Sequence, residues 1–169
     1  MFVIKSIILF VIFVISVIIG KMISERYVYR LKELEEAKNL LNIFKTKVKF
    51  TYEPIPKIFE NISQNTNSNI GTIFLSAKQK MQTDSASNSW EDAVDEYKGY
   101  LKEEDKPILK MLSKLLGKTD VEGQISQIEI TEQFLDEKIK QAQIEKEKNE
   151  KLYKKLGVAT GLMIVIILI

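Results

Sequence analysis

Residues 6–20 read SIILFVIFVISVIIG, a run rich in Ile, Val and Phe that contains no charged side chain. Counted from Met1, and interrupted only by Lys5, the apolar sequence would form a helix of about 30 Å, the thickness of a bilayer's hydrocarbon core. A cleaved signal peptide would end in a small-x-small site, whereas residues 17–21 read VIIGK. We therefore predict an uncleaved N-terminal transmembrane helix over residues 1–20.

The other end of the chain is apolar as well. Residues 156–169 read LGVATGLMIVIILI and also contain no charge. As a helix they would extend only about 21 Å, so a crossing would need bilayer thinning or close pairing with another helix. Lys154 and Lys155 could extend their ammonium groups to the membrane surface. We predict a second transmembrane helix over residues 156–169.

Gly157 and Gly161 stand one helical turn apart in this second segment. Two small residues at this spacing allow another helix backbone to approach closely in a membrane. The partner expected from the sequence is Ser16 or Gly20 of the first segment. Chance is an equally good explanation, because glycine is common in membrane-spanning helices.

Basic residues next to the apolar segments predict the orientation of the chain. Nine of them lie on the side of residues 21–155, and only Lys5 lies on the far side. Cytosolic flanks of membrane spans are enriched in Lys and Arg. We therefore expect a cytosolic domain over residues 21–155 and both termini outside. The nine are Lys21, Arg26, Arg30, Lys32, Lys146, Lys148, Lys151, Lys154 and Lys155.

The middle of the chain shows helical periodicity. Apolar residues recur every three or four positions from Ile23 to Val48, and this helix should end before the two prolines of residues 54–56. Sustained alternation of apolar and polar residues, the pattern of a strand, is absent. The fold class predicted is all-α. Four further helices are expected over residues 56–63, 70–81, 90–101 and 106–116, the third capped by Ser89 and the fourth following Asp105. A last helix should start at the capping box of residues 119–122 and continue into the C-terminal segment.

The composition excludes several kinds of chemistry. The chain has no Cys and no His, which removes thiolate nucleophiles, the commonest general base and the commonest transition-metal ligands. Its acidic clusters at residues 92–96 and 103–105 are interleaved with or bordered by lysines, as solvated surfaces are. The net charge of +2 does not indicate nucleic-acid binding. We expect neither catalysis nor a cofactor or metal ion.

Short motifs in a fixed order resemble the stage III sporulation protein AB family of endospore-forming bacteria, over essentially the whole chain. Each motif alone is weakly specific, but their order and their position between two apolar ends make the set specific. The motifs are Ser24-Glu25-Arg26, Pro54-Ile55-Pro56, Ser89-Trp90-Glu91-Asp92-Ala93, residues 116–120 (LGKTD) with Gln124, and residues 148–157 (KNEKLYKKLG).

This resemblance implies a helical bundle related to the inner-membrane platform protein F of type II secretion and type IV pilus machines. The implied role is a scaffold in the channel complex between mother cell and forespore, placed on the mother-cell side in the outer forespore membrane. Its implied partners are a cytosolic ATPase and membrane ring proteins. Glu25, Arg26 and Trp90 lie in the matching motifs and are candidate partner-interface residues. Residues 47–50, KVKF, replace an acidic motif of the family, so no role of that acid carries over.

An alternative from a different class is a membrane-anchored coiled-coil stalk unrelated to sporulation, whose helices pair between chains. The apolar residues Ile130, Phe134 and Ile144 lie off the main stripe of the last helix and favour some further contact. They fit either reading, and homo-oligomerisation stays open. A pore is less well supported, because polar groups inside a membrane usually mark a conduction path and both apolar segments lack charges.

Overall fold

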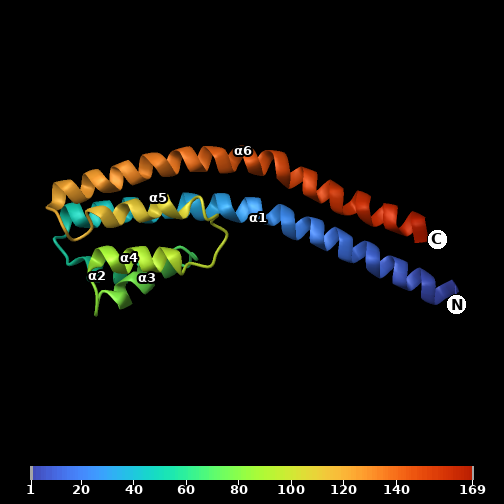
Figure 1. Ribbon diagram of the computed structural model, residues 1–169, viewed down its shortest axis with the longest axis horizontal. Helices are drawn as coiled ribbons and strands as arrows, with labels where there is room; N and C mark the ends of the chain where they lie inside the picture. Colours follow the sequence, from blue (N-terminus) through green and yellow to red (C-terminus); the bar gives the residue numbers. More distant parts are fainter. Residues whose placement is uncertain (1, 169) are drawn as a thin grey trace. The chain divides into compact units, whose positions relative to one another are not determined.

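The computed structural model describes residues 2–168, which form helices and connecting turns with no strand in that range (Figure 1). The all-α prediction is therefore confirmed for this part of the chain. Two helices, one from each end of the sequence, are several times longer than the others. The elements are α1 (Phe2–Phe50), α2 (Ile55–Gln64), α3 (Gly71–Lys80), α4 (Ala86–Asp95), α5 (Lys106–Lys110), a 3-10 helix η1 (Met111–Lys114) and α6 (Val121–Leu168).

The chain divides into two compact units. The terminal unit comprises Met1–Leu31 and Gln141–Ile169, and the central unit comprises Lys32–Lys140. α1 and α6 contribute residues to both units, whereas α2 to α5 belong to the central unit alone. The predicted membrane boundaries at residues 20 and 155 mark where apolar sequence ends, and they stay predictions.

α1 ends where the backbone reverses direction before the two prolines. The Thr51 amide and hydroxyl both donate to the carbonyl of Lys47, at 2.9 and 2.8 Å. Tyr52 follows with a φ of 54°, a left-handed conformation that is uncommon for a residue with a side chain. Pro54 then precedes α2, because its fixed φ suits the start of a helix. The predicted helix end before residues 54–56 is correct.

Four aromatic side chains form the centre of the central unit. Phe44 of α1, Phe59 of α2, Phe74 of α3 and Trp90 of α4 are each at most 1% exposed. Their ring centroids lie 5.0 to 5.5 Å apart, mostly in edge-to-face pairs, and such pairs add about 0.5–1.5 kcal/mol each beyond burial. The Trp90 indole also donates to the Leu109 carbonyl at 2.7 Å. This cluster joins α2, α3 and α4 to α1.

α4 differs from the predicted helix at both ends. It begins at Ala86 with Ser85 as its cap, the Ser85 hydroxyl accepting the amide of Asn88 at 3.2 Å. Ser89, the cap expected from the sequence, lies inside the helix and is fully buried. The helix ends at Asp95 and not near residue 101.

The early end of α4 has a cause far away in the sequence. Glu33 of α1 is only 4% exposed, and its carboxylate accepts the backbone amides of Tyr100 and Leu101 at 2.7 and 3.0 Å. These bonds hold the turn after α4 in a non-helical path. Gly99 lies in this turn, and a Cβ there would be 2.1 Å from the Tyr97 phenol oxygen.

The Tyr97 phenol is enclosed beside the same carboxylate. Its oxygen is buried without a partner in good hydrogen-bond geometry among the described residues. Burial, followed by the nearby Glu33 carboxylate, raises the pKa of Tyr97. The raised pKa keeps the phenol neutral beside the Glu33 carboxylate.

The turn into α6 follows the predicted chemistry with one shift. Gly117 has a φ of +70°, as expected of a glycine that ends a helical segment. Asp120 accepts the Gly123 amide at 2.9 Å and so caps α6, whereas the sequence pattern assigned this role to Thr119.

Replacing Glu33 with Gln should destabilise the central unit by about 1–2 kcal/mol, because the two amide bonds would lose their charged acceptor. Unfolding of the full chain in detergent can be followed through the fluorescence of Trp90, the sole tryptophan. Glu35→Gln is the matched control, since Glu35 lies two residues further along the same helix and is exposed. Equal stability of the two variants would show that the Glu33 charge does not hold the turn.

Candidate functional site

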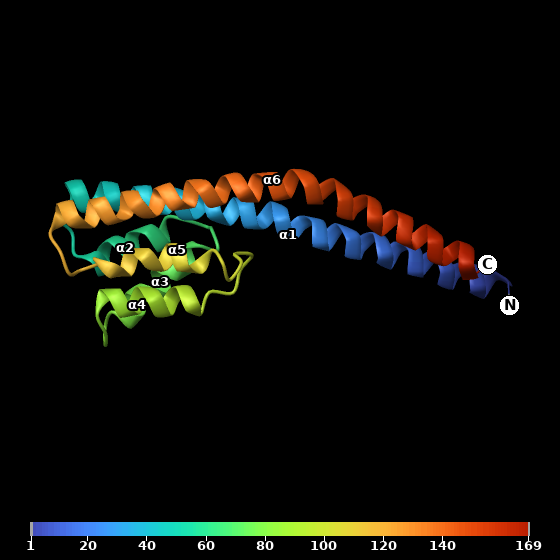
Figure 2. The same ribbon diagram turned by 45° about the horizontal axis from the view of Figure 1, so that its top comes forward.

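The backbones of α1 and α6 touch within the terminal unit, where the two segments lie side by side (Figures 1 and 2). A Cβ added to Gly20 would lie 2.7 Å from the Gly157 Cα and equally close to the Tyr153 carbonyl oxygen. A Cβ added to Gly157 would lie 3.0 Å from the Gly20 Cα. A side chain at either position would push the helices apart.

Small and hydroxyl residues continue this contact along both helices. The Ser16 hydroxyl donates to the Gly157 carbonyl at 2.9 Å. A Cβ added to Gly161 would lie 3.2 Å from the Cβ of Ser16 and 2.8 Å from the Phe13 ring. The structure thus places Gly157 against Ser16 and Gly20, and Gly161 against Ser16 and Phe13. Ser24, one turn beyond Gly20, is fully buried, and its hydroxyl has no partner among the described residues.

Two further contacts join the helices farther from the chain ends than the glycine contact. The rings of Tyr27 and Tyr153 stack with centroids 5.8 Å apart and planes inclined by 14°. Burial, and then the neighbouring Tyr153 hydroxyl, raises the pKa of Tyr27. Arg30, with a side chain only 2% exposed, pairs with Glu145 at 2.8 Å. Neither pair follows from the sequence, because no local pattern relates residues more than a hundred positions apart.

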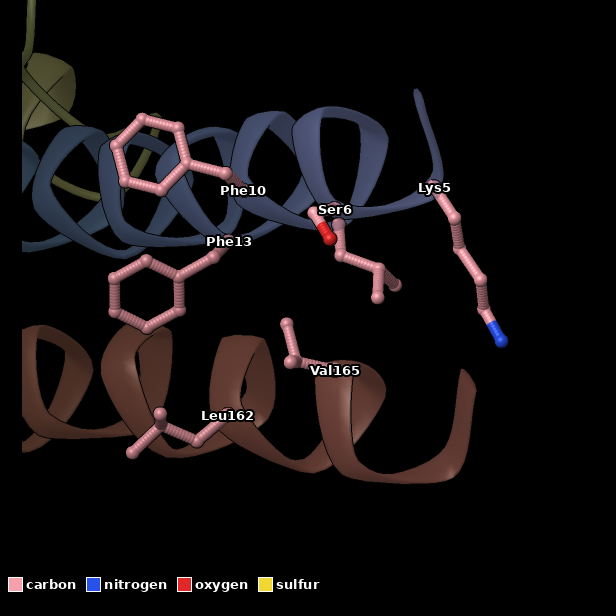
Figure 3. Close-up of a pocket in the computed structure, with 7 residues that line it drawn as sticks. Lys5, Ser6, Phe10, Phe13, Leu162 and Val165 are labelled. Atoms are coloured by element: carbon pink, nitrogen blue, oxygen red, sulfur yellow. The ribbon is translucent and has the colours of Figure 1, made fainter. Parts of the chain in front are cut away.

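Near the ends of the chain the two helices leave an open apolar groove of about 600 Å³ (Figure 3). Phe13 and Val165 extend into the space between the helices, whereas Lys5 extends beyond the helix ends. Such a groove would be filled by acyl chains if this part of the protein lies in a bilayer.

Among residues 2–168, one helix is long and apolar enough to cross a membrane, and it is α1. Only 11% of its most apolar stretch is buried within the protein. The C-terminal part of α6, from Leu156 onward, is helical but short, so its membrane crossing stays a prediction.

The three candidate interface residues do not form one site. Glu25 and Arg26 belong to the terminal unit. The Glu25 Oε1 atom lies 3.7 Å from the Lys21 Nζ atom, and Arg26 is exposed. Trp90 belongs to the central unit and is 1% exposed, so it offers no surface to a partner. Its contribution is to the aromatic core. Within the described range, no group of three or more acidic, His or Cys side chains is placed to hold a metal ion.

Exposed apolar side chains mark a different surface of the central unit. Ile130 and Phe134 lie one turn apart on α6 and are 39% and 42% exposed. The sequence placed both off the buried stripe, and the structure agrees. Phe50 and Tyr52, at the end of α1, are more exposed still, and the sequence analysis did not single them out.

The contact between the helices can be tested by a disulfide. In the variant Ser16→Cys with Gly161→Cys, the two Cβ atoms would be close enough for a bond, and the chain has no other cysteine. Mild oxidation of the full chain in membranes should produce an intramolecular cross-link rapidly. Adding Gly157→Leu should slow it strongly by separating the helices.

The matched control for this cross-link is Ile18→Cys with Ile166→Cys, two exposed positions on the same helices. Because these positions lie about 10 Å apart along the helix axis, this pair should cross-link slowly. A disulfide-linked dimer from the first pair would instead show that α1 and α6 pair between chains, as in a stalk.

Comparison with known proteins gives a consistent result. The profile of the family described as stage III sporulation protein AB matches residues 5–169. Stage III sporulation protein AB of Bacillus subtilis (strain 168) is 22% identical over 153 residues, which cover 88% of this chain and 90% of that protein. A solved structure of stage III sporulation protein AB has a TM-score of 0.63 and 18% identity, covering 69% of this chain and 95% of the solved one, and so shares its fold. Since the family match leaves out only the first four residues, this chain belongs to the stage III sporulation protein AB family.

Proposed function

We propose that this sporulation-family protein is a membrane platform of the complex that joins mother cell and forespore. In this role it docks a cytosolic ATPase and membrane partners, and it performs no catalysis. The observation that carries the proposal is that α1 and α6 supply both the central unit and the paired apolar segments. A platform requires a folded unit that binds partners and apolar segments that anchor it. Here the same two helices contribute to both.

The central unit supports a platform better than a stalk. A stalk would pair long helices between chains, whereas here α1 packs on α2, α3 and α4 of its own chain through the Phe44, Phe59, Phe74 and Trp90 cluster. Lys38 and Lys45 of α1 also reach Asp136 and Glu132 of α6, each at 2.6 Å. Both long helices therefore satisfy their buried faces and many of their charges within one chain.

The docking surface that we propose is centred on Phe134, with Ile130 beside it. The two side chains lie one turn apart on α6 and form a small exposed apolar patch that a docked partner would cover. The central unit carries sixteen basic and nineteen acidic residues, so the partner surface that meets it should be neutral or basic.

A photoreactive residue at Phe134 should cross-link to the ATPase of the complex in sporulating cells. The same residue at Thr83, an exposed loop position of the central unit, is the matched control and should give no such product. Mass spectrometry of the affinity-purified product identifies the partner. Equal cross-linking from both positions, or cross-linking only between copies of this chain, would contradict the proposed docking surface.

The proposed orientation places the central unit in the mother-cell cytosol and the apolar segments in the outer forespore membrane. Its support is the bias of nine basic residues against one at the flanks of the apolar segments. The bias counts only residues close to the apolar segments, where the rule applies.

Single cysteines test this orientation cleanly, because the chain has none of its own. Thr83→Cys should be protected from an impermeant thiol reagent added to intact cells and should react after lysis. When the protein is produced in the plasma membrane of growing cells, whose far side faces the medium, a cysteine appended to the C-terminus should react from outside. Labelling of Thr83→Cys in intact cells would contradict the proposed orientation. Protection of the C-terminal cysteine would mean that the second apolar segment does not cross the membrane.

A further inference from the structure

The two units of the chain have net charges of opposite sign. The terminal unit contains nine basic and four acidic residues, a net charge of +5. The central unit has a net charge of −3 by the same count, so the two together give the +2 of the whole chain. The positive charge is therefore concentrated in the unit that also contains the apolar segments.

Within the terminal unit, three lysines share one face of α6. Lys148, Lys151 and Lys155 are spaced by three and four residues, which places them in line along a helix, and all three are exposed. Gly157, which touches α1, lies about half a turn away from this face. We call these three residues the lysine face.

The same face of the helix continues directly into apolar sequence. Continuing at intervals of three or four residues from Lys155 leads through Ala159 to Leu162 and Ile166. Leu162 and Ile166 are 50% and 73% exposed. The order of groups along this face matches the order in a lipid monolayer: ammonium groups lie at the level of the charged headgroups, and exposed aliphatic side chains lie at the level of the acyl chains.

Three carboxylates on the same stretch of α6 form their hydrogen bonds or ion pairs with residues outside the lysine face. Glu145 pairs with Arg30 at 2.8 Å, Glu147 accepts the Gln143 amide at 2.6 Å, and Glu150 pairs with Lys154 at 2.8 Å. The Lys154 hydrogen bond lowers the pKa of Glu150, while Lys151 and Lys146 act on that carboxylate only at longer range.

Each of these acids is therefore engaged by another residue. None of the three lysines has a hydrogen bond or an ion pair within 4 Å among the described residues.

We propose that the lysine face binds the phosphate groups of anionic phospholipids. A lysine ammonium is a compact charge on a flexible stem, suited to phosphate contact without a fixed geometry. Basic residues directly beside an apolar segment lie within the distance over which an anionic membrane surface attracts them. This inference rests on the membrane placement proposed above and is independent of ATPase docking.

The test uses the full chain reconstituted in phosphatidylcholine vesicles that contain phosphatidylglycerol as a minor component. Spin-labelled forms of the two lipids report, by electron paramagnetic resonance, which lipid the protein immobilises. At low salt we expect a preference for phosphatidylglycerol of about fivefold, falling as salt is added. The triple variant Lys148→Gln, Lys151→Gln, Lys155→Gln should lose most of this preference.

The matched control removes three exposed lysines of the central unit, Lys98→Gln, Lys114→Gln and Lys140→Gln, and should keep the full preference. Flotation of each variant with the vesicles shows that it remains inserted. Loss of preference with insertion intact separates failure of the lysine face from failure of the membrane placement.

The proposal is overturned if the unmodified protein shows no lipid preference, if the two triple variants behave alike, or if the lysine-face variant keeps its preference. In the last case, loss of a protein partner by that variant would assign the face to an acidic protein surface instead.

Discussion

α1 and α6 meet backbone to backbone at Gly20 and Gly157, where neither residue leaves room for a Cβ. Close packing and the hydrogen bond from the Ser16 hydroxyl to the Gly157 carbonyl hold the two helices together at this point. The antiparallel pairing that this contact permits brings residues 1–31 and 141–169 together in the terminal unit. The terminal unit, with its stacked tyrosines and buried ion pair, depends on that approach.

Local sequence was sufficient wherever local chemistry decides the structure. Helical periodicity and the proline pair predicted α1, α2 and α3 within a few residues, whereas the spacing of Gly157 and Gly161 left a helix contact and chance equally open. Around α4 it was insufficient, because Ser85, Ser87 and Ser89 are all chemically able to cap a helix. In the structure Ser85 is the cap, and Ser87 and Ser89 are buried inside α4.

Long-range contacts explain the rest of what the sequence did not reveal. The end of α4 depends on a carboxylate at Glu33, more than sixty residues before the amides that it binds. Trp90 lies in a family motif, and that motif alone could not tell a buried anchor from an exposed interface residue. The family resemblance itself was correct, because it rests on the order of many weak motifs and not on any single side chain.

Together with the glycine contact, the ion pair between Arg30 and Glu145 fixes the register of α1 against α6. Sliding α6 along α1 by one residue would drive side chains into Gly20 and would leave a buried guanidinium without its carboxylate. Two points about ten residues apart thus lock the register of the helices. Movements transmitted along this pair must then be tilts or rotations of both helices together, since one cannot be pulled past the other.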